Sequence, residues 1–529
     1  MHKRSIFKAV TLALGLTVVL PQLASAAGIS IVRELDSNNY DPQKTTALAA
    51  AEVLFMLGDT LVAMDKDMKT LVPSLAKSWD MSADGKTYVF QLRDDVTFCN
   101  GKKFTAADAA FSLNRLADPA TASPAGWRAG SVESIKATGD YTLEYKLKQP
   151  FSELLYQLTQ SFATIIDEDN VKELGANFGV AGLNTTGPFC WGEWRPRDKM
   201  VLNKHDNYKW GPAIYQNTGP AQVDSVTWTI VPEANTRTTA LLTGQADISR
   251  AIPYLAYSQF RSMPGFEIHK SDVAAWTEFF GFKMDKPTVK DLAVRKAMNL
   301  AFNQAAMVSD LYFDEVIPAT TYMSPTTRDW PEAANAILAE KNVEAAKKMM
   351  EEAGWVEGSD GIRVKDGVRL APVFYSFAGS APQARAEYLQ AEMRKIGIDI
   401  QIQAFDPTIV WSKLSTQEFD MYNVGYHYMS ATDGLNLYFP SKNVPAPNRM
   451  NWKDAETDAL LEEAKSAVDP AKRAEAAGKV VVKVEDAATW IPIYHEPISL
   501  VQSTRLKPIT PNSIQGTGFY KGLDFAINE

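Results

Sequence analysis

Histidine, cysteine and the motifs built from them give little sign of reaction chemistry in this sequence of 529 residues. The histidines are widely scattered along the chain: His2, His205, His269, His427 and His495. No His-Glu-x-x-His, Gly-x-Ser-x-Gly, Cys-x-x-Cys or phosphate-binding glycine loop occurs. Because catalytic groups are recognised by their geometry, an enzyme would need a site that no local motif announces. We therefore expect binding without catalysis, with no metal site and no cofactor.

Aromatic residues are the side chains best suited to hold a solute. They gather in residues 375–377 and 423–433, the second of which reads Asn-Val-Gly-Tyr-His-Tyr-Met-Ser-Ala-Thr-Asp. Flat faces with hydroxyl and imidazole tips suit stacking combined with hydrogen bonds. Because successive side chains of a strand point to opposite faces, only one set, Tyr426 and Tyr428 or else His427 and Met429, should face a cleft. The other set would be core.

The N-terminus has the pattern of a secretory signal peptide. A short basic start, an apolar run over residues 6–20 and the small residues Ala24-Ser25-Ala26 predict cleavage after residue 26. The next residue is Ala27 and not cysteine, so we expect a periplasmic protein without a lipid anchor. No later run reaches the ~18 apolar residues of a membrane span.

Export bears on the two cysteines, Cys99 and Cys190. An exported chain with a small, even number of cysteines favours one disulfide between them. A metal site would need further ligands nearby, and the sequence offers none there. The net charge of −9 also argues against nucleic acid as a partner, because neutralising phosphates requires a basic surface.

The elements that must position these residues are clearest in residues 71–116. Asp84-Gly85 predicts a turn beside a strand over residues 86–93, and Thr105 with Asp108 predicts a capped helix start. Later, a helix over residues 384–396 ends at Gly397 and is followed by alternating isoleucines. Helix, glycine stop and strand together indicate an α/β fold.

The same segment carries a family resemblance. Residues 71–116 contain Pro-x-Leu-Ala-x-x-Trp, Asp-Gly-Lys-x-Tyr-x-Phe-x-Leu-Arg and Phe-x-x-Gly-x-x-Phe-Thr-Ala-x-Asp, in that order. This pattern resembles the signature of the large extracellular solute-binding proteins of peptide, nickel and opine type, the receptors of ABC importers. Weaker matches, such as Thr186-Gly187-Pro188-Phe189, extend the resemblance over nearly the whole mature chain.

The resemblance implies a two-lobed periplasmic binding protein, or Venus flytrap, with a hinge and an extra subdomain in the first lobe. The expected division places the signal peptide at 1–26, the core of the first lobe at 27–63, 201–270 and 497–529, its extra subdomain at 64–200, and the second lobe at 271–496. Cys99 would tie the subdomain to the strand that contains Cys190.

The resemblance also implies where the solute binds. In the first lobe it points to the loop before a helix, at Thr45, Thr46, Ala47 and Leu48. In the second lobe the expected contacts are Tyr375, Phe377, Arg385, Trp411, Tyr426, His427, Tyr428 and Asp433. We expect Tyr426→Ala to weaken binding by more than about 1 kcal/mol.

The identity of the solute stays open among a peptide, a sugar conjugate or opine, and a metal complex. In peptide-binding members of the family, an aspartate near the end of the equivalent strand holds the α-amino group of the peptide. Aligned on Gly425, that position here is Met429, whose thioether cannot form the charge-assisted bond. A peptide or peptide-like solute is expected, with a sugar conjugate or an opine-type ligand as the alternative.

Two other classes of function have discriminating observations. An exported enzyme would turn over a candidate solute, whereas a periplasmic chaperone or scaffold would show no rise in melting temperature with any solute. For a receptor we expect a monomer that delivers its solute to the transmembrane permease subunits of an importer.

Overall fold

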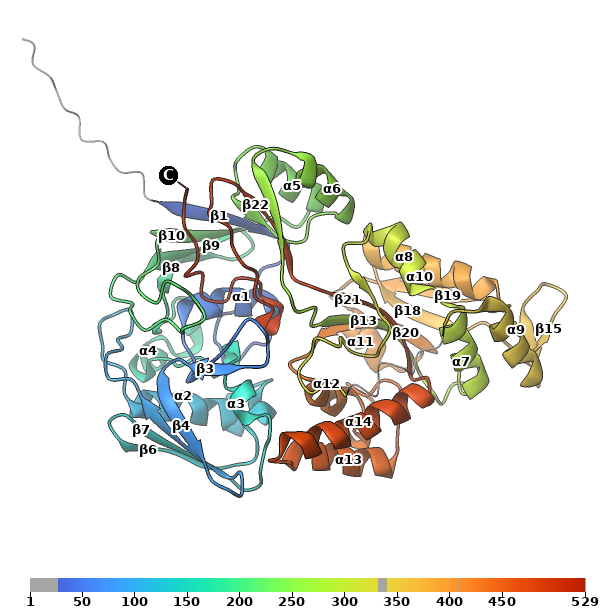
Figure 1. Ribbon diagram of the computed structural model, residues 1–529, viewed down its shortest axis with the longest axis horizontal. Coiled ribbons are helices and arrows are strands. Elements are labelled where there is room, and N and C mark those ends of the chain that lie inside the picture. The colour runs from blue at the N-terminus through green and yellow to red at the C-terminus, as the bar shows by residue number, and fades with distance from the viewer. Residues whose placement is uncertain (1–26, 332–339, 408, 529) are drawn as a thin grey trace, which may run out of the picture.

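The computed structural model describes residues 27–331, 340–407 and 409–528. The predicted signal peptide, residues 1–26, lies outside the described residues. Two large sheets form the centres of two lobes that lie side by side along the long axis of the molecule (Figure 1). The two-lobed α/β architecture expected from the sequence is therefore present.

A mixed sheet of seven strands forms the core of the first lobe. Strand β1 runs parallel to its neighbours β10 and β11, and the other neighbours pair antiparallel. In spatial order the strands are β12 (Phe266–Lys270), β22 (Ser499–Ser503), β11 (Ile248–Ser249), β1 (Gly28–Arg33), β10 (Ser225–Ile230), β9 (Lys199–Lys204) and β8 (Phe189–Arg195).

The disulfide between Cys99 and Cys190 is present, as the sequence predicted, with the two Cα atoms 5.8 Å apart. Cys190 lies in β8, and Cys99 lies in the loop before α2 (Ala106–Ala117). The bond therefore fastens the subdomain to the seven-stranded sheet. The expected subdomain boundary at residue 200 would fall within β9 and would leave β8, its neighbour in that sheet, in the subdomain.

A four-stranded antiparallel sheet with α2 on it forms the subdomain in the lower left of Figure 1. Helix α2 begins with the expected capping box, in which the Asp108 carboxylate accepts from the backbone N–H of Thr105 at 2.9 Å. The sheet, in spatial order, contains β4 (Ala76–Met81), β5 (Thr87–Leu92), β7 (Thr142–Leu147) and β6 (Val132–Gly139).

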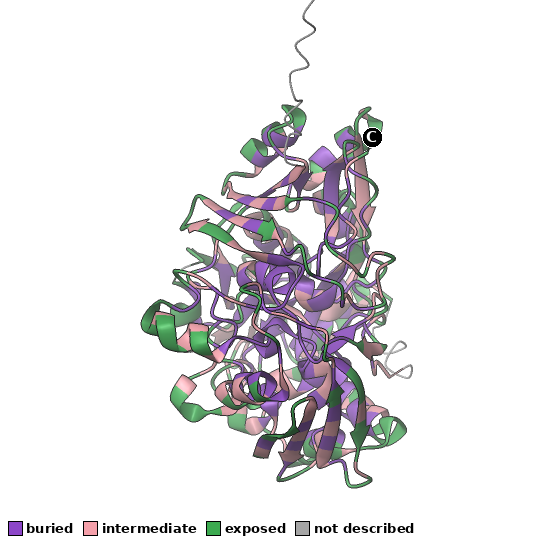
Figure 2. Ribbon diagram, turned by 90° about the vertical axis from the view of Figure 1, so that its left-hand side faces the viewer, coloured by how far each residue is buried: buried purple, intermediate pink, exposed green. Residues whose placement is uncertain are grey.

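The second lobe is built on a mixed sheet of six strands. Its strand order is β14 (Ile317–Pro318), β21 (Trp490–Glu496), β13 (Trp276–Phe282), β20 (Met421–His427), β18 (Val373–Phe377) and β19 (Gln401–Phe405). Helices cover both faces of this sheet, so its interior strands are largely buried. Figure 2 views the molecule from the side of the first lobe and shows buried residues in its interior and exposed residues on outer helices and turns. Two small sheets complete the strands: β2 (Val62–Met64) with β3 (Leu71–Pro73), and β15 (Val356–Glu357) with β16 (Arg363–Lys365) and β17 (Val368–Arg369).

The helices divide between the lobes in the same way. Besides α2, the first lobe contains α1 (Leu48–Leu57), α3 (Leu154–Gln157), α4 (Glu168–Leu174), α5 (Ala234–Leu242) and α6 (Tyr254–Ser262). The second lobe contains α7 (Leu292–Ala301), α8 (Gln304–Tyr312), α9 (Val343–Glu352), α10 (Ser380–Arg394), α11 (Val410–Ser415), α12 (Ala431–Tyr438), α13 (Ala455–Ser466) and α14 (Pro470–Asp486).

The chain passes between the two large sheets twice. Residues 271–275 connect β12 to β13, and residues 497–498 connect β21 to β22. We refer to these two stretches as the crossing segments. Because each links an end of one sheet directly to an end of the other, the two sheet edges nearest the crossing segments must face each other.

Candidate functional site: the cleft between the lobes

The edge of the second-lobe sheet that faces the first lobe is formed by the carboxyl ends of its parallel strands. Strands β19, β18 and β20 run in parallel and end at Phe405, Phe377 and His427. Strand β21 runs in the same direction and ends at Glu496. In open α/β sheets such an edge is the usual place for a ligand, because the loops and helix starts beyond it leave a crevice.

The first lobe presents the matching edge of its own sheet. The residues beyond the ends of β1 and β11, together with the start of α1, surround a small hollow of about 100 Å³. It is lined by Arg33, Glu34, Leu35, Leu48, Ala49, Glu52, Arg250 and Ala251. Leu35 and Leu48 are 63% and 42% exposed, so apolar surface is open to a solute here.

Charged groups in this hollow are already bonded to one another. Glu52 accepts from Arg33 at 3.3 Å and also pairs with Arg250. Arg250 donates further to the carbonyl of Thr517 at 2.6 Å. Arg33 also donates to the Tyr40 hydroxyl at 2.8 Å, so both arginines that line the hollow are already hydrogen-bonded within the protein.

Leu48 of the first lobe and His427 of the second both lie beside Gly516. A Cβ atom on Gly516 would lie 3.6 Å from Leu48 Cδ1 and 3.5 Å from His427 Cδ2. Two residues predicted for the site, one from each lobe, are thus close together. The other predicted residues of the first lobe lie in the loop just before: Thr45 is buried and its hydroxyl accepts from the backbone N–H of Ala47 at 3.2 Å, and Thr46 is exposed.

The imidazole of His427 is neutral. Burial lowers its pKa to about 4, although its hydrogen bond with the backbone of Ser513 acts in the opposite direction. Its Nε2 atom has no hydrogen-bond partner among the described residues. A neutral ring with an unused nitrogen at the junction of the two lobes can still accept or donate one hydrogen bond.

Trp276 lies across the second-lobe edge between two polar residues. It pairs with His427 on β20 and with Glu496 on β21. Its ring packs against Gly425, where a Cβ atom would lie 2.4 Å from Trp276 Cζ2. Glycine at 425 is therefore required for the indole to lie close to the strand.

Arg385 belongs to a buried network inside the second lobe. Its guanidinium donates to Glu278 at 2.9 Å, to Asn423 at 3.1 Å and to the Tyr312 hydroxyl at 3.0 Å. Glu278 also accepts from the indole N–H of Trp276 at 3.1 Å. The proposed ligand role of Arg385 stays a prediction, and in this arrangement its side chain supports Trp276 through Glu278.

Tyr426 and Asp433 contact the first lobe through one arginine. Arg128, which follows the subdomain helix, donates to the Asp433 carboxylate at 2.9 Å and to the Tyr426 hydroxyl at 3.1 Å. The side chain of Gln157 joins the same group by accepting from Arg128 at 2.8 Å. Burial alone would lower the pKa of Arg128, but Asp433 and its other neighbours outweigh that effect and raise it.

The remaining predicted residues fall into two groups. Tyr428 and Tyr375 are buried in the second-lobe core, at 0% and 5% exposure. Trp411 is 49% exposed and packs edge to face on Phe377, with ring centroids 5.6 Å apart. Met429 lies in an apolar cluster with first-lobe residues such as Phe55. Tyr426, His427 and Met429 each lie beside first-lobe residues. Members of both alternating sets therefore reach the first lobe, because β20 ends at the edge of the sheet that faces it.

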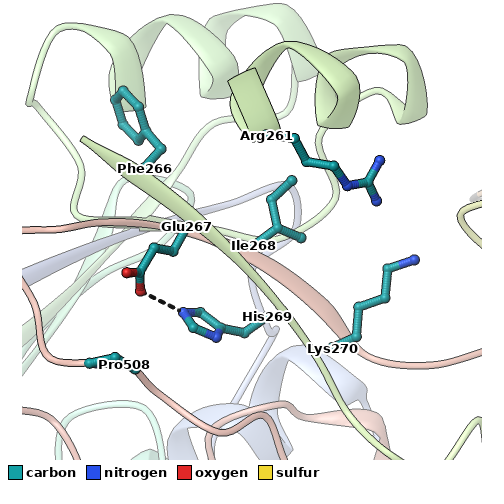
Figure 3. A pocket seen from close by; sticks show the side chains of 7 residues that line it. All are labelled: Arg261, Phe266, Glu267, Ile268, His269, Lys270 and Pro508. Atoms are coloured by element: carbon teal, nitrogen blue, oxygen red, sulfur yellow. Dashed lines mark hydrogen bonds and ion pairs between the residues drawn. The ribbon is translucent and has the colours of Figure 1, made fainter. Parts of the chain in front are cut away.

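A second hollow lies outside the cleft, along the free edge of β12. It has a volume of about 540 Å³ and is lined by Arg261, Phe266, Glu267, Ile268, His269, Lys270 and Pro508. Figure 3 shows Glu267 and His269 on one side of the strand and Arg261 and Lys270 on the other. Since its polar groups diverge and do not converge on a common point, it is a weaker candidate for a solute site than the cleft.

The structure adds residues to the site that sequence reasoning missed. Arg128, Arg250, Trp276 and Glu496 all lie on surfaces that face the other lobe. No local pattern marks them, because each is brought to the cleft by its position at the end of a strand or loop. Glu496 and Trp276 could have been suspected from their places beside the crossing segments.

These geometric features agree with comparisons to known proteins. Residues 70–446 match the model of the bacterial extracellular solute-binding proteins, family 5 Middle. The chain belongs to this family. Its members bind solutes, which accords with the expectation of binding without catalysis.

Individual relatives support the same assignment. The glutathione-binding protein GsiB of Escherichia coli (strain K12) is 25% identical over 523 residues, 95% of this chain and 96% of that protein. Three solved structures share the fold over 95% of this chain and 99–100% of theirs. They are Brucella suis NikA with Fe(III)-EDTA (22% identity, TM-score 0.84), Campylobacter jejuni NikZ with Ni(L-His) (21%, 0.81) and Helicobacter pylori DppA with the peptide STSA (23%, 0.79). They support the predicted fold class of a two-lobed periplasmic binding protein.

Two further structural observations bear on partners. Among residues 27–331, 340–407 and 409–528, no helix is long and apolar enough to cross a membrane. Within the same described residues, one group has the spacing of metal ligands, Cys99, Cys190 and His205, and its two sulfur atoms are joined in the disulfide.

Proposed function

We propose that this chain captures a peptide or peptide-like solute between its lobes and delivers it to the permease of an ABC importer. The observation that carries the proposal is the pair of facing strand edges, which combine exposed apolar groups with buried polar ones. Closure around a solute that contacts both edges would be favoured by its stronger binding to the closed form. Micromolar affinity corresponds to about 8 kcal/mol.

Identification of the solute by mass spectrometry tests this function directly. Protein purified from its native host is denatured, and the released small molecules are compared with those from a mock purification. We expect one peptide-like species in an amount comparable to that of the protein. Recovery of no specific solute, together with no rise in melting temperature across a solute panel, would refute the proposal.

A sugar conjugate or an opine-type solute is the second candidate. It is favoured by the exposed ring of Trp411, which packs on Phe377, and by Met429, which lies in an apolar cluster where a carboxylate could have been. Aromatic faces of this kind suit the flat, partly apolar surface of a sugar ring. The same mass-spectrometric experiment separates the two candidates.

Tyr426 is a proposed contact of the solute that two matched variants can test. Tyr426→Ala should weaken binding of the released solute by more than about 1 kcal/mol, measured by calorimetry. Tyr426→Phe keeps the ring and removes only the hydroxyl that accepts from Arg128, so it separates direct contact from an effect on the lobes. Unchanged affinity in Tyr426→Ala would remove Tyr426 from the site.

The same proposal includes the setting of the protein. We propose an exported, periplasmic monomer without a lipid anchor, made with a signal peptide over residues 1–26. The first-lobe core would comprise 27–63, 201–270 and 497–529 and the second lobe 271–496. The subdomain, given above as 64–200, would better end before β8, since that strand pairs in the first-lobe sheet.

A further inference from the structure

Glu496 lies at the last position of β21, directly before a crossing segment. Its side chain is partly exposed, and its Oε1 atom accepts a hydrogen bond of 2.7 Å from the hydroxyl of Tyr254. Tyr254 begins α6 of the first lobe. The carboxylate of Glu496 therefore stands between the two lobes, at the cleft edge of the second.

No positively charged side chain among the described residues forms an ion pair with Glu496. The two arginines that act on it electrostatically are engaged elsewhere: Arg250 pairs with Glu52, and Arg385 pairs with Glu278. Burial raises the pKa of the Glu496 carboxyl, and the neighbouring Glu278 raises it further. A partly buried carboxylate without a cation is unfavourable, and a bound cation would relieve this.

The neighbours of Glu496 suit a small organic cation. Trp276 is its register partner on β13, and Trp276 in turn pairs with His427 on β20, so two aromatic residues share this edge of the sheet with Glu496. The exposed apolar side chain of Leu48, from the first lobe, lies beside Gly516, as does the ring of His427. An ammonium group could pair with the carboxylate while its carbon chain or its charge lies against the aromatic faces.

We propose that Glu496 binds a free ammonium group of the solute, so that the cleft selects solutes with a primary amine. This inference rests on the proposed solute-binding function and names a chemical requirement of its ligand. It also places the amine beside the crossing segments and not at Met429, which lies in an apolar cluster.

A matched pair of solute mixtures tests the requirement. The probes are a tryptic digest of casein and the same digest after exhaustive acetylation of its primary amines, each titrated against ligand-free protein while the melting temperature is recorded. The untreated digest should raise the melting temperature, and the acetylated digest should not. Glu496→Gln should need about 10- to 100-fold more untreated digest for the same rise, the range for loss of one charge-assisted hydrogen bond.

Glu267→Gln is the control variant. Glu267 is also a strand glutamate with a single polar partner, His269 at 3.1 Å, but it lies on β12 outside the cleft. It should behave as the wild type. An acetylated digest that is as effective as the untreated one, or a Glu496→Gln variant with undiminished response, would overturn the inference and leave solute binding intact. No response to either digest would also overturn it. The proposed function is tested separately, by identifying the solute that the denatured protein releases.

The ligand-free protein gives a second readout. Because the pKa of Glu496 is raised in the folded state, its contribution to the free energy of unfolding is favourable below its ordinary pKa of about 4.3 and is lost as pH rises. Glu496→Gln removes that loss, so its melting temperature should exceed that of the wild type increasingly between pH 4 and 8. A constant difference across this range would show that the carboxylate is already compensated and would overturn the inference.

Discussion

The charged side chains that join the two lobes lie in two regions, and their contacts in these regions differ in kind. We use "hinge-side contacts" for those of Tyr254, Arg261 and Lys270 beside the crossing segments, and "far-side contacts" for those of Arg128 and Arg328 on the opposite side of the cleft. The hinge-side residues belong to α6 and β12, the far-side residues contact groups in or beside α3 and α12, and Figure 1 labels α6, α3 and α12.

The far-side contacts are buried and densely bonded. Arg128 is 8% exposed and reaches Asp433, and Arg328 is 5% exposed and donates to Glu153 at 2.6 Å. The guanidinium of Arg328 also lies 3.5 Å from the centre of the Tyr156 ring. Each pair joins one residue of the first lobe to one residue of the second.

The hinge-side contacts are more exposed. Glu315 of the second lobe, whose own side chain is 3% exposed, accepts from Arg261 at 2.6 Å and from Lys270 at 2.7 Å, and the side chains of these two donors are 50% and 32% exposed. Such pairs are screened by water and salt and contribute little each. Close to the pivot, a rotation of the lobes moves them only slightly.

This difference identifies the far-side contacts as the ones that distinguish a closed from an open arrangement. A rotation about the crossing segments separates distant groups most, so opening would break the pairs of Arg128 and Arg328 first. In the open form the charged groups of these pairs would be hydrated by water. The pairs therefore stabilise the closed form relative to the open form.

The largest effect is expected from Arg128→Ala. Removing one partner of a buried ion pair costs about 3–5 kcal/mol, and here the cost falls on the closed form because opening lets water reach Asp433. The radius of gyration of the variant, measured by small-angle X-ray scattering, should be larger than that of the wild type. Arg93→Ala, which removes an exposed pair within the subdomain, is the control. An unchanged radius would contradict the distinction between the two regions.

A smaller effect in the same direction is expected from Glu153→Gln. Arg328 loses a charged acceptor but keeps Asp329 at 2.6 Å, so the closed form should lose about 1.5–3 kcal/mol. The double variant with Arg128→Ala measures coupling between the two pairs. If Glu153→Gln opened the protein more than Arg128→Ala does, the ranking within the far side would be wrong.

The smallest effect is expected from Glu315→Gln. Its two basic partners remain hydrated, so the free energy of unfolding in urea should fall by only about 1 kcal/mol, and by less in high salt. Burial would raise the pKa of Glu315, but the bonds from Arg261 and Lys270 outweigh it and lower that pKa.

The lowered pKa gives this last prediction a pH dependence. A carboxyl whose pKa is lower in the folded state contributes stability above its ordinary pKa of about 4.3 and loses it as pH falls through the lowered value. The difference between wild type and Glu315→Gln should therefore shrink on acidification from pH 7 to pH 3. If Glu315→Gln changed the radius of gyration as strongly as Arg128→Ala does, the assignment of the hinge-side contacts to the pivot would be contradicted.

Much of the fold could be predicted from local sequence. The capping box at Thr105 and Asp108 specifies where a helix begins, since both residues lie within one turn. The disulfide followed from the number of cysteines and the export signal, and the aromatic residues around Tyr426 marked the strand that ends at the cleft. In each case the information needed lies within a few residues or in a simple count.

The sequence by itself determined the class of protein: its lobed α/β architecture, its disulfide and its family, through motifs whose members are neighbours along the chain. Only the tertiary structure decided which groups meet across the cleft. Arg128 and Asp433 are 305 residues apart, and Tyr254 and Glu496 are 242 apart. Local sequence propensity does not predict these contacts, because they depend on how the crossing segments join the two sheets. For that reason Arg385, predicted to hold a solute, donates to groups of its own lobe, while Glu496, which no motif marked, accepts a hydrogen bond from Tyr254 of the other lobe.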